Sequence, residues 1–117
     1  MAYSFRNLEV WQKAVELSVQ VYKITSQFRD YWFRDQITRS SLSVPSNIAE
    51  GYNRQSEKET IQFLYIARGS CSELETQILI GMKIDYFTEQ KWDELIEKSL
   101  EVARMLYGLI KNKKLKL

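Results

Sequence analysis

The sequence has no histidine among its 117 residues, and it contains one cysteine, one proline and four glycines. Without histidine, the most common general base and metal ligand is missing. This absence excludes Ser-His-Asp and Cys-His catalysis and the Glu-x-x-His motif of di-iron bundles. The lone thiol, Cys71, falls on an apolar helical face, where a packed side chain is expected. We therefore expect a non-enzymatic protein with no catalytic residue, no cofactor and no bound metal.

Long apolar runs are also missing. No stretch approaches the roughly 18 residues of a membrane span, and no positively charged start leads into the apolar run of a secretory signal. A single cysteine rules out an internal disulfide, so a reduced, cytoplasmic location is expected. The hydrophobic content of 44% is enough to fill a core. We expect one domain over residues 1–117 that folds without metal or disulfides.

The charge is unevenly distributed along the chain. Residues 104–117 hold five basic and no acidic residues, whereas the remainder holds 12 basic and 15 acidic residues. A lysine-rich end can simply solubilise the chain and interact well with the dipole of the preceding helix. Alternatively, it contacts nucleic acid or another acidic partner.

Four segments show helical periodicity, and none shows the alternation of a strand. The first places Val10, Ala14, Leu17 and Val21 at alternating steps of four and three. The second spans about residues 32–54, the third opens with a capping-box pattern at Ser56, and the fourth follows an N-cap at Thr88. Short connections between long helices favour antiparallel neighbours. The predicted fold is an all-α, antiparallel, up-down-up-down four-helix bundle.

The only proline, Pro45, falls inside the second helical segment. Proline removes one backbone hydrogen bond and costs about 3 kcal/mol in an ordinary helix interior, so we expect a kink there. Polar residues also recur on this helix at steps of three and four, and a second polar stripe follows on the third helix. The two stripes contain Gln36, Arg39, Ser43, Asn47, Glu50, Ser70 and Glu73.

Folding back after residues 53–55 would bring these two stripes together. We expect Arg39 and Glu73 to form a charge pair and Ser43 and Asn47 to supply hydrogen bonds near the proline. Such a network could fix the helix register and stabilise the kink. Alternatively, part of it lines a groove or an assembly channel.

The predicted topology gathers basic residues at one end of the bundle, because both termini and the connection between the second and third helices must lie there. We expect phosphate contacts without base specificity, because no stacking platform is evident beside these charges. The residues expected to contact nucleic acid are Arg54, Lys58, Lys111, Lys113, Lys114 and Lys116.

Several motifs, in order along nearly the whole chain, resemble a known bacterial family. They are VWQKA at 10–14, SVPSNIAEG at 43–51, Arg54 with Ser56, FL and IA at 63–67, GS at 69–70 and ELETQ at 73–77. They resemble the four-helix bundle proteins encoded in intervening sequences of 23S ribosomal RNA genes. That family is similar in fold to the accessory protein of diversity-generating retroelements, a homopentamer that associates with a reverse transcriptase and nucleic acid.

The resemblance implies the bundle fold and a homopentamer and, more weakly, an RNA-related role. Two functions stay open at this point. The first is an oligomeric RNA-binding or ribonucleoprotein accessory factor. The second is a protein–protein interaction scaffold that does not bind nucleic acid.

Overall fold

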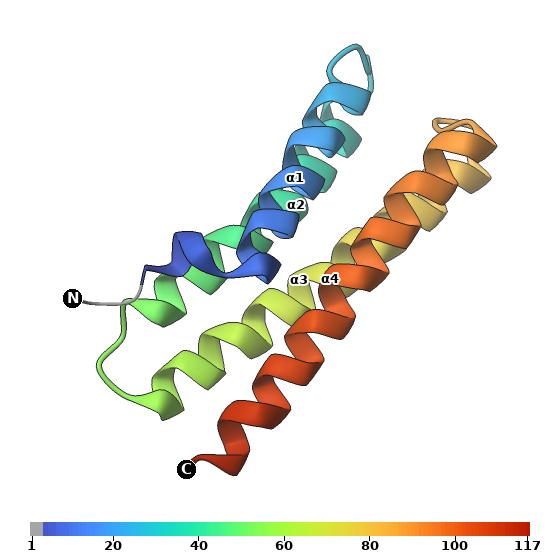
Figure 1. Ribbon diagram of the computed structural model, residues 1–117. Helices are drawn as coiled ribbons and strands as arrows, with labels where there is room; N and C mark the ends of the chain where they lie inside the picture. Colours follow the sequence, from blue (N-terminus) through green and yellow to red (C-terminus); the bar gives the residue numbers. More distant parts are fainter. Residues whose placement is uncertain (1–3) are drawn as a thin grey trace.

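The computed structural model describes residues 4–117, and within that part all regular structure is helical (Figure 1). A short 3-10 helix, η1, precedes four α-helices. Their bounds are η1 Phe5–Asn7, α1 Glu9–Thr25, α2 Tyr31–Tyr52, α3 Glu57–Lys83 and α4 Glu89–Leu115. The predicted all-α four-helix bundle is confirmed.

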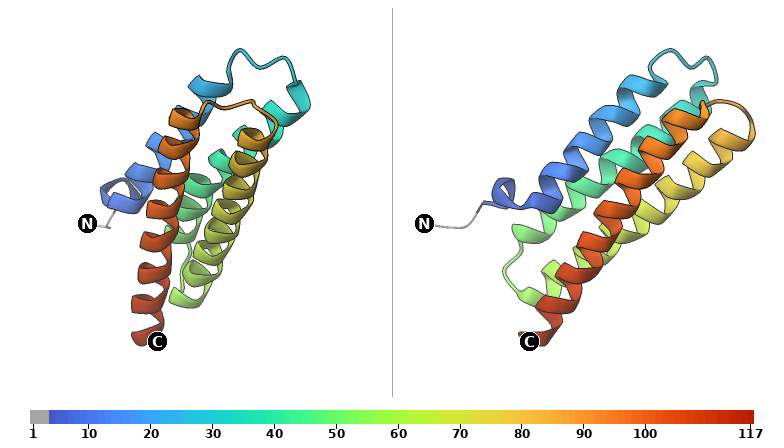
Figure 2. Two further views of the ribbon diagram at one scale, coloured as in Figure 1. Left: turned by 90° about the vertical axis from the view of Figure 1, so that its right-hand side faces the viewer. Right: turned by 45° about the vertical axis from the view of Figure 1, so that its right-hand side comes forward.

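The helices form an elongated bundle of 45 × 21 × 20 Å. Followed by colour, the chain turns back at each connection, so that α1 and α2 form one hairpin and α3 and α4 a second (Figures 1 and 2). The C-terminus and the α2–α3 connection lie at one end, and the α1–α2 and α3–α4 connections lie at the other. We call the first of these the terminal end and the second the loop end.

Side-chain caps fix where three of the helices begin. Asp30, Ser56 and Thr88 accept hydrogen bonds from backbone N–H groups in the first turns of α2, α3 and α4. Each cap satisfies one of the amides that a helix leaves unpaired at its start. The N-caps predicted at Ser56 and Thr88 are confirmed.

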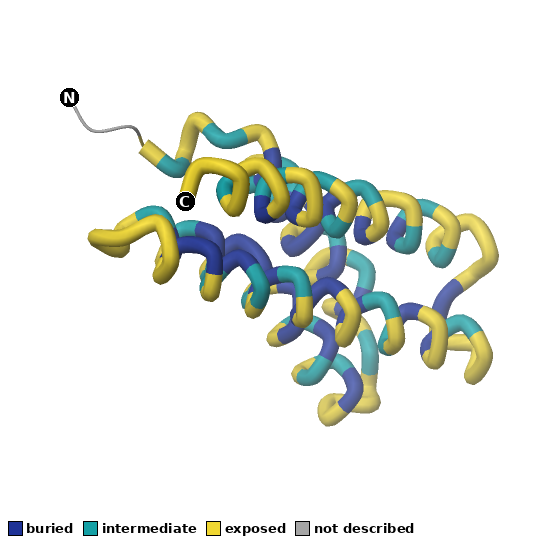
Figure 3. Tube along the Cα trace, turned by 90° about the horizontal axis from the view of Figure 1, so that it is seen from below, coloured by how far each residue is buried: buried dark blue, intermediate teal, exposed yellow. Residues whose placement is uncertain are grey.

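The core is built from the apolar face of each helix, and Figure 3 shows the buried positions facing the bundle interior. Fully buried members include Leu17, Ile48, Leu64 and Leu106, one from each α-helix. The aromatic side chains of Phe28, Phe33, Tyr86 and Phe87 close the loop end of this core.

Helix α2 continues through Pro45, which is buried. One turn before it, the Ser41 hydroxyl lies 3.3 Å from the Ser18 hydroxyl of α1. The end of α2 is fixed on α3 by a hydrogen bond of 2.8 Å that the Thr60 hydroxyl donates to the Gly51 carbonyl. Helix α2 therefore contacts α1 before the proline and α3 after it, and a kink at Pro45 stays a prediction.

Within residues 4–117, no helix is both long and apolar enough to span a membrane. The same residues contain no group of three or more cysteine or acidic side chains placed to hold a metal ion.

Candidate nucleic-acid interface

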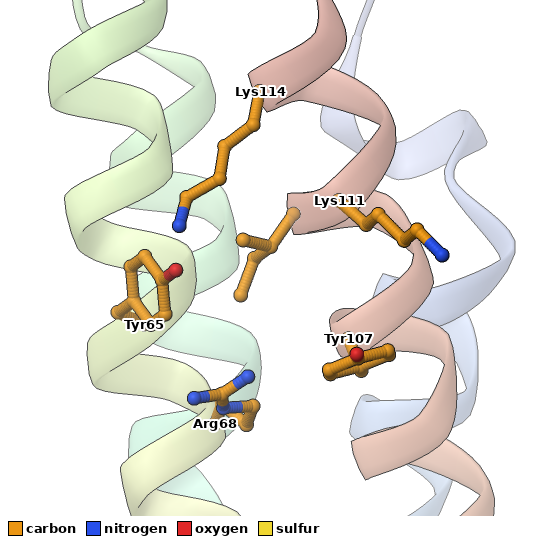
Figure 4. Close-up of a pocket in the computed structure, with 6 residues that line it drawn as sticks. Tyr65, Arg68, Tyr107, Lys111 and Lys114 are labelled. Atoms are coloured by element: carbon orange, nitrogen blue, oxygen red, sulfur yellow. The ribbon is translucent and has the colours of Figure 1, made fainter.

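A basic hollow of about 200 Å³ lies between α3 and α4 near the terminal end (Figure 4). We call it the α3–α4 hollow. Each side chain that lines it within the described chain is basic, aromatic or aliphatic. The lining residues are Tyr65, Arg68, Tyr107, Ile110, Lys111 and Lys114.

Helical spacing explains why these side chains meet. Tyr65 and Arg68 lie one turn apart on α3, and Tyr107, Lys111 and Lys114 follow one another at steps of four and three on α4. Residues three and four apart share one face of a helix. Because α3 and α4 lie side by side, the two faces oppose each other across the hollow (Figure 4).

The cations are positioned by the aromatic rings. The Arg68 guanidinium carbon lies 5.0 Å from the ring centre of Tyr65 and 5.9 Å from that of Tyr107. The Lys114 ammonium reaches across from α4 to lie 5.0 Å from the Tyr65 ring centre. Cation–π contacts of this kind are worth about 0.5–1 kcal/mol at exposed sites. They hold two positive charges at the hollow without neutralising them.

Only two of the six predicted nucleic-acid contacts, Lys111 and Lys114, line the hollow. Lys113 instead points to the start of α3, where its ammonium lies 3.2 Å from the Glu57 carboxylate and 4.9 Å from the Tyr52 ring centre. Its charge is therefore partly neutralised. These three lysines belong to the last turns of α4 and not to a tail beyond it.

The other three predicted contacts also lie at the terminal end. Arg54 forms an ion pair with Glu50 and stacks over Phe63, with 4.6 Å from its guanidinium carbon to the ring centre. Lys58 and Lys116 are exposed, and within residues 4–117 neither forms an ion pair. The α3–α4 hollow, in contrast, groups three cations, Arg68, Lys111 and Lys114, that form no ion pair within residues 4–117.

The expectation that no aromatic platform lies beside the basic residues is wrong. Tyr65 and Tyr107 lie among the basic residues of the hollow, and Tyr107 is 59% exposed. An exposed ring beside cations is the arrangement that proteins use to bind unpaired bases.

The predicted polar network forms in part, around Ser43. Its hydroxyl lies 2.8 Å from the Ser70 hydroxyl of α3. The Asn47 amide donates to the Ser43 carbonyl at 2.8 Å and to the Ser43 hydroxyl at 2.9 Å. The Ser43–Ser70 contact links α2 to α3, while the two bonds from Asn47 stay within α2, and all three lie within one turn of Pro45.

The predicted charge pair between Arg39 and Glu73 is wrong. Both residues are exposed, and no ion pair joins them in the described chain. The Ser43–Ser70 contact sets an antiparallel register in which Arg39 lies level with Leu74. A difference of one residue turns a helical side chain by about 100°. Glu73 precedes Leu74 by one residue, so its side chain points in a different direction from a side chain at the level of Arg39.

Gln36 and Glu50 do not extend the network either. Gln36 is half-buried, and no side-chain hydrogen bond of its amide is found within residues 4–117. Glu50 is exposed and pairs with Arg54 on its own helix. The network is thus confined to Ser43, Asn47 and Ser70.

Cys71 is a packed core residue. It is 2% exposed, and burial, followed by the nearby charge of Glu75, raises the pKa of its thiol to about 12. A thiol with so high a pKa stays protonated near neutral pH and is a poor nucleophile.

Residues 6–108 match the family of 23S rRNA-intervening sequence proteins. The chain belongs to this family. A crystal structure from Bacteroides thetaiotaomicron VPI-5482, described as a protein with unknown function from the S23 ribosomal protein family, is similar, with a TM-score of 0.82 and 27% identity. The similarity covers 87% of this chain and 98% of that one. No curated protein matches the chain.

In this 23S rRNA-intervening sequence protein, the matched residues include Tyr65, Arg68 and Tyr107 but stop before Lys111 and Lys114. The site residues predicted from the sequence do not include Tyr65, Arg68 or Tyr107. The signal that could have found them is the spacing of an aromatic and a basic residue by three or four on each of two adjacent helices.

Proposed function

We propose that this 23S rRNA-intervening sequence protein is a non-enzymatic, RNA-binding accessory protein that contacts the phosphate backbone through its terminal end. One observation carries the proposal: Arg68, Lys111 and Lys114 line the hollow together with two tyrosines, and no acidic side chain lines it within the described chain. Phosphate neutralisation supplies most of the affinity in sequence-independent nucleic-acid binding. The net charge of +2 is small, so the local grouping of charge is what favours binding.

Charge-driven RNA binding has a characteristic dependence on salt. Each phosphate contact adds to the slope of log K against log salt, with about 0.7 per contact for a single strand. The double variant Lys111→Gln/Lys114→Gln should weaken RNA binding and make this slope shallower by roughly 1.4. Fluorescence anisotropy of a labelled single-stranded RNA across a salt series measures both quantities.

The matched control is Lys83→Gln/Lys98→Gln. It removes the same number of charges from exposed lysines on α3 and α4 that lie outside the hollow. This control should keep the wild-type slope. An absence of RNA affinity at low salt in the unaltered protein, or equal losses in both double variants, would contradict the proposal.

We further propose that the protein works as a homo-oligomer, with a homopentamer as the form to be tested. The supporting observation is an apolar groove of about 340 Å³ between α1 and α2, lined mainly by Val15, Val19, Tyr22, Leu42 and Pro45. Val19, Tyr22 and Leu42 are 46%, 48% and 48% exposed. Contiguous exposed apolar surface of this kind is typical of interaction sites.

The same groove supports the second candidate function, a scaffold that docks a different protein and does not bind nucleic acid. The two functions differ in their response to salt, since apolar docking is far less sensitive to ionic strength than phosphate binding. They also differ in what occupies the groove, which is a second copy of the chain in the first case and a different protein in the other.

A further inference from the structure

We propose that the α3–α4 hollow holds one unstacked base of a single-stranded nucleic acid on the Tyr107 ring, with Arg68, Lys111 and Lys114 holding the flanking phosphates. This inference rests on the proposed RNA binding and adds to it a base-stacking subsite and a preference for single strands.

The two tyrosines of the hollow differ in accessibility. Tyr65 is half-buried, and its ring is approached by both Arg68 and Lys114 (Figure 4). Tyr107 is 59% exposed, and within residues 4–117 its hydroxyl makes no hydrogen bond. Among the described residues, Tyr65 therefore contacts two cations, whereas Tyr107 contacts Arg68 alone, at the longer distance of 5.9 Å, and its more exposed ring can accept a planar group.

Cations stand where the phosphates of a stacked nucleotide would lie. Lys111 follows Tyr107 by one turn of α4, about 6 Å along the axis. The guanidinium of Arg68 lies on the other helix, between the two rings (Figure 4). A base on Tyr107 would thus have positive charge from α3 and α4 within reach of its backbone.

The size of the hollow favours part of a longer chain over a free metabolite. Its volume of about 200 Å³ is below the roughly 300–1,000 Å³ of pockets that enclose a small molecule. A stacking platform needs to hold only one base, because the rest of a strand continues over the surface.

Stacking also selects the form of the nucleic acid. In a duplex, neighbouring bases cover both faces of each base, so an exposed protein ring can gain little stacking energy from a duplex. Unpaired bases in loops and single strands present free faces to aromatic side chains. A site that combines phosphate contacts with a free ring should therefore bind a single strand more tightly than a duplex.

The test compares Tyr107→Ala with wild type on a labelled oligouridylate and on a duplex RNA of equal phosphate number. Base stacking on an aromatic ring is worth enough that the variant should bind the single strand roughly 5-fold to 100-fold more weakly. Duplex binding should change by less than about 2-fold, because the cations remain. Tyr107→Trp should retain or improve single-strand affinity.

Tyr31→Ala is the matched control. Tyr31 is 61% exposed and carries Arg34 over its ring at 4.8 Å, but it lies on α2 at the loop end. This variant should bind the oligouridylate like wild type. Circular dichroism should show both alanine variants to be folded, because both tyrosines are exposed.

The outcomes separate this inference from the proposed function. Equal wild-type affinity for single strand and duplex, or unchanged single-strand binding by Tyr107→Ala, overturns the stacking subsite while salt-dependent RNA binding stands. Absence of binding to either RNA at low salt overturns both.

Discussion

Asp30 and Tyr86 join the two connections at the loop end through a single hydrogen bond. The Tyr86 hydroxyl donates to one Asp30 carboxylate oxygen at 2.6 Å, and the other oxygen caps α2 by accepting from the Phe33 N–H at 3.0 Å. The bond from Tyr86, followed by that from Phe33, lowers the pKa of Asp30. The same bond to Asp30 is the main cause that raises the pKa of Tyr86.

The signs of these shifts predict a pH window of stability. A lowered carboxyl pKa stabilises the fold above the ordinary value of 3.8, and this contribution is lost as pH falls below it. A raised phenol pKa stabilises the fold below the ordinary value of 10.0, and this contribution is lost as pH rises above it. Tyr86→Phe should therefore lower the thermal midpoint most between these two values. Melting curves across pH measure the difference from wild type.

Tyr31→Phe serves as the control for that experiment. It removes a phenol hydroxyl from the same end of the bundle, where the ring contacts Arg34 and the hydroxyl makes no hydrogen bond within residues 4–117. Its midpoint should follow wild type at each pH. A deficit in Tyr86→Phe that stays constant from acid to alkaline pH would show that the Asp30 bond does not carry the effect.

At the scale of the helices, local signals account for what the sequence predicts well. The period of apolar residues and the caps at Ser56 and Thr88 depend only on neighbours within a turn, so the four helices and the start of α3 and α4 follow from them. The short connections then restrict how consecutive helices can be arranged.

The candidate site depends on information that the sequence holds less directly. Arg39 and Glu73 fail to meet because a register difference of one residue rotates a side chain to another face. Tyr65 and Tyr107 are far apart in sequence, and their approach depends on how α3 and α4 are rotated about their own axes. Side-chain packing between the helices sets that rotation, and periodicity alone specifies only which broad face is buried.

Gly51 and Gly69 differ in the space available for a side chain. A Cβ at Gly51, in the last turn of α2, would lie 2.9 Å from the Phe63 Cβ and 3.2 Å from the Thr60 carbonyl oxygen. Neither atom is the end of a flexible side chain. Gly69, near the middle of α3, has no such neighbour within 4 Å.

Alanine at these two positions should therefore change stability in opposite directions. Gly51→Ala should destabilise the protein by about 1–3 kcal/mol through overpacking. Gly69→Ala should stabilise it by about 0.5–1 kcal/mol, because alanine loses less backbone entropy in a helix. Urea unfolding followed by circular dichroism measures both, and equal stabilisation by the two changes would show that the α2–α3 contact at Gly51 can relax freely.

At the scale of the whole molecule, an apolar surface and a basic surface lie at different places. The apolar groove between α1 and α2 and the basic hollow between α3 and α4 lie on different helix pairs. Self-association through the groove would leave the hollow of each subunit accessible. Several hollows on one particle could then engage one strand, and linked sites can exceed the affinity of one site by roughly 10²-fold or more.

The final prediction concerns this assembly. Leu42→Glu places a charge in the apolar groove and should convert the proposed oligomer into folded monomers, since a charged side chain at an apolar contact is costly to desolvate. Native mass spectrometry and light scattering measure the mass of the particle. Because avidity is lost with the oligomer, the monomer should also bind a long single-stranded RNA more weakly while binding a short one like wild type.

Ile66→Glu is the matched control, because Ile66 is 51% exposed, close to the 48% of Leu42, but lies on α3 outside the groove. It should leave the mass of the assembly unchanged. A wild-type protein that is monomeric at all concentrations would refute the oligomer. It would leave the groove as a docking surface for a different protein, and each hollow would then have to bind RNA without the gain from neighbouring copies.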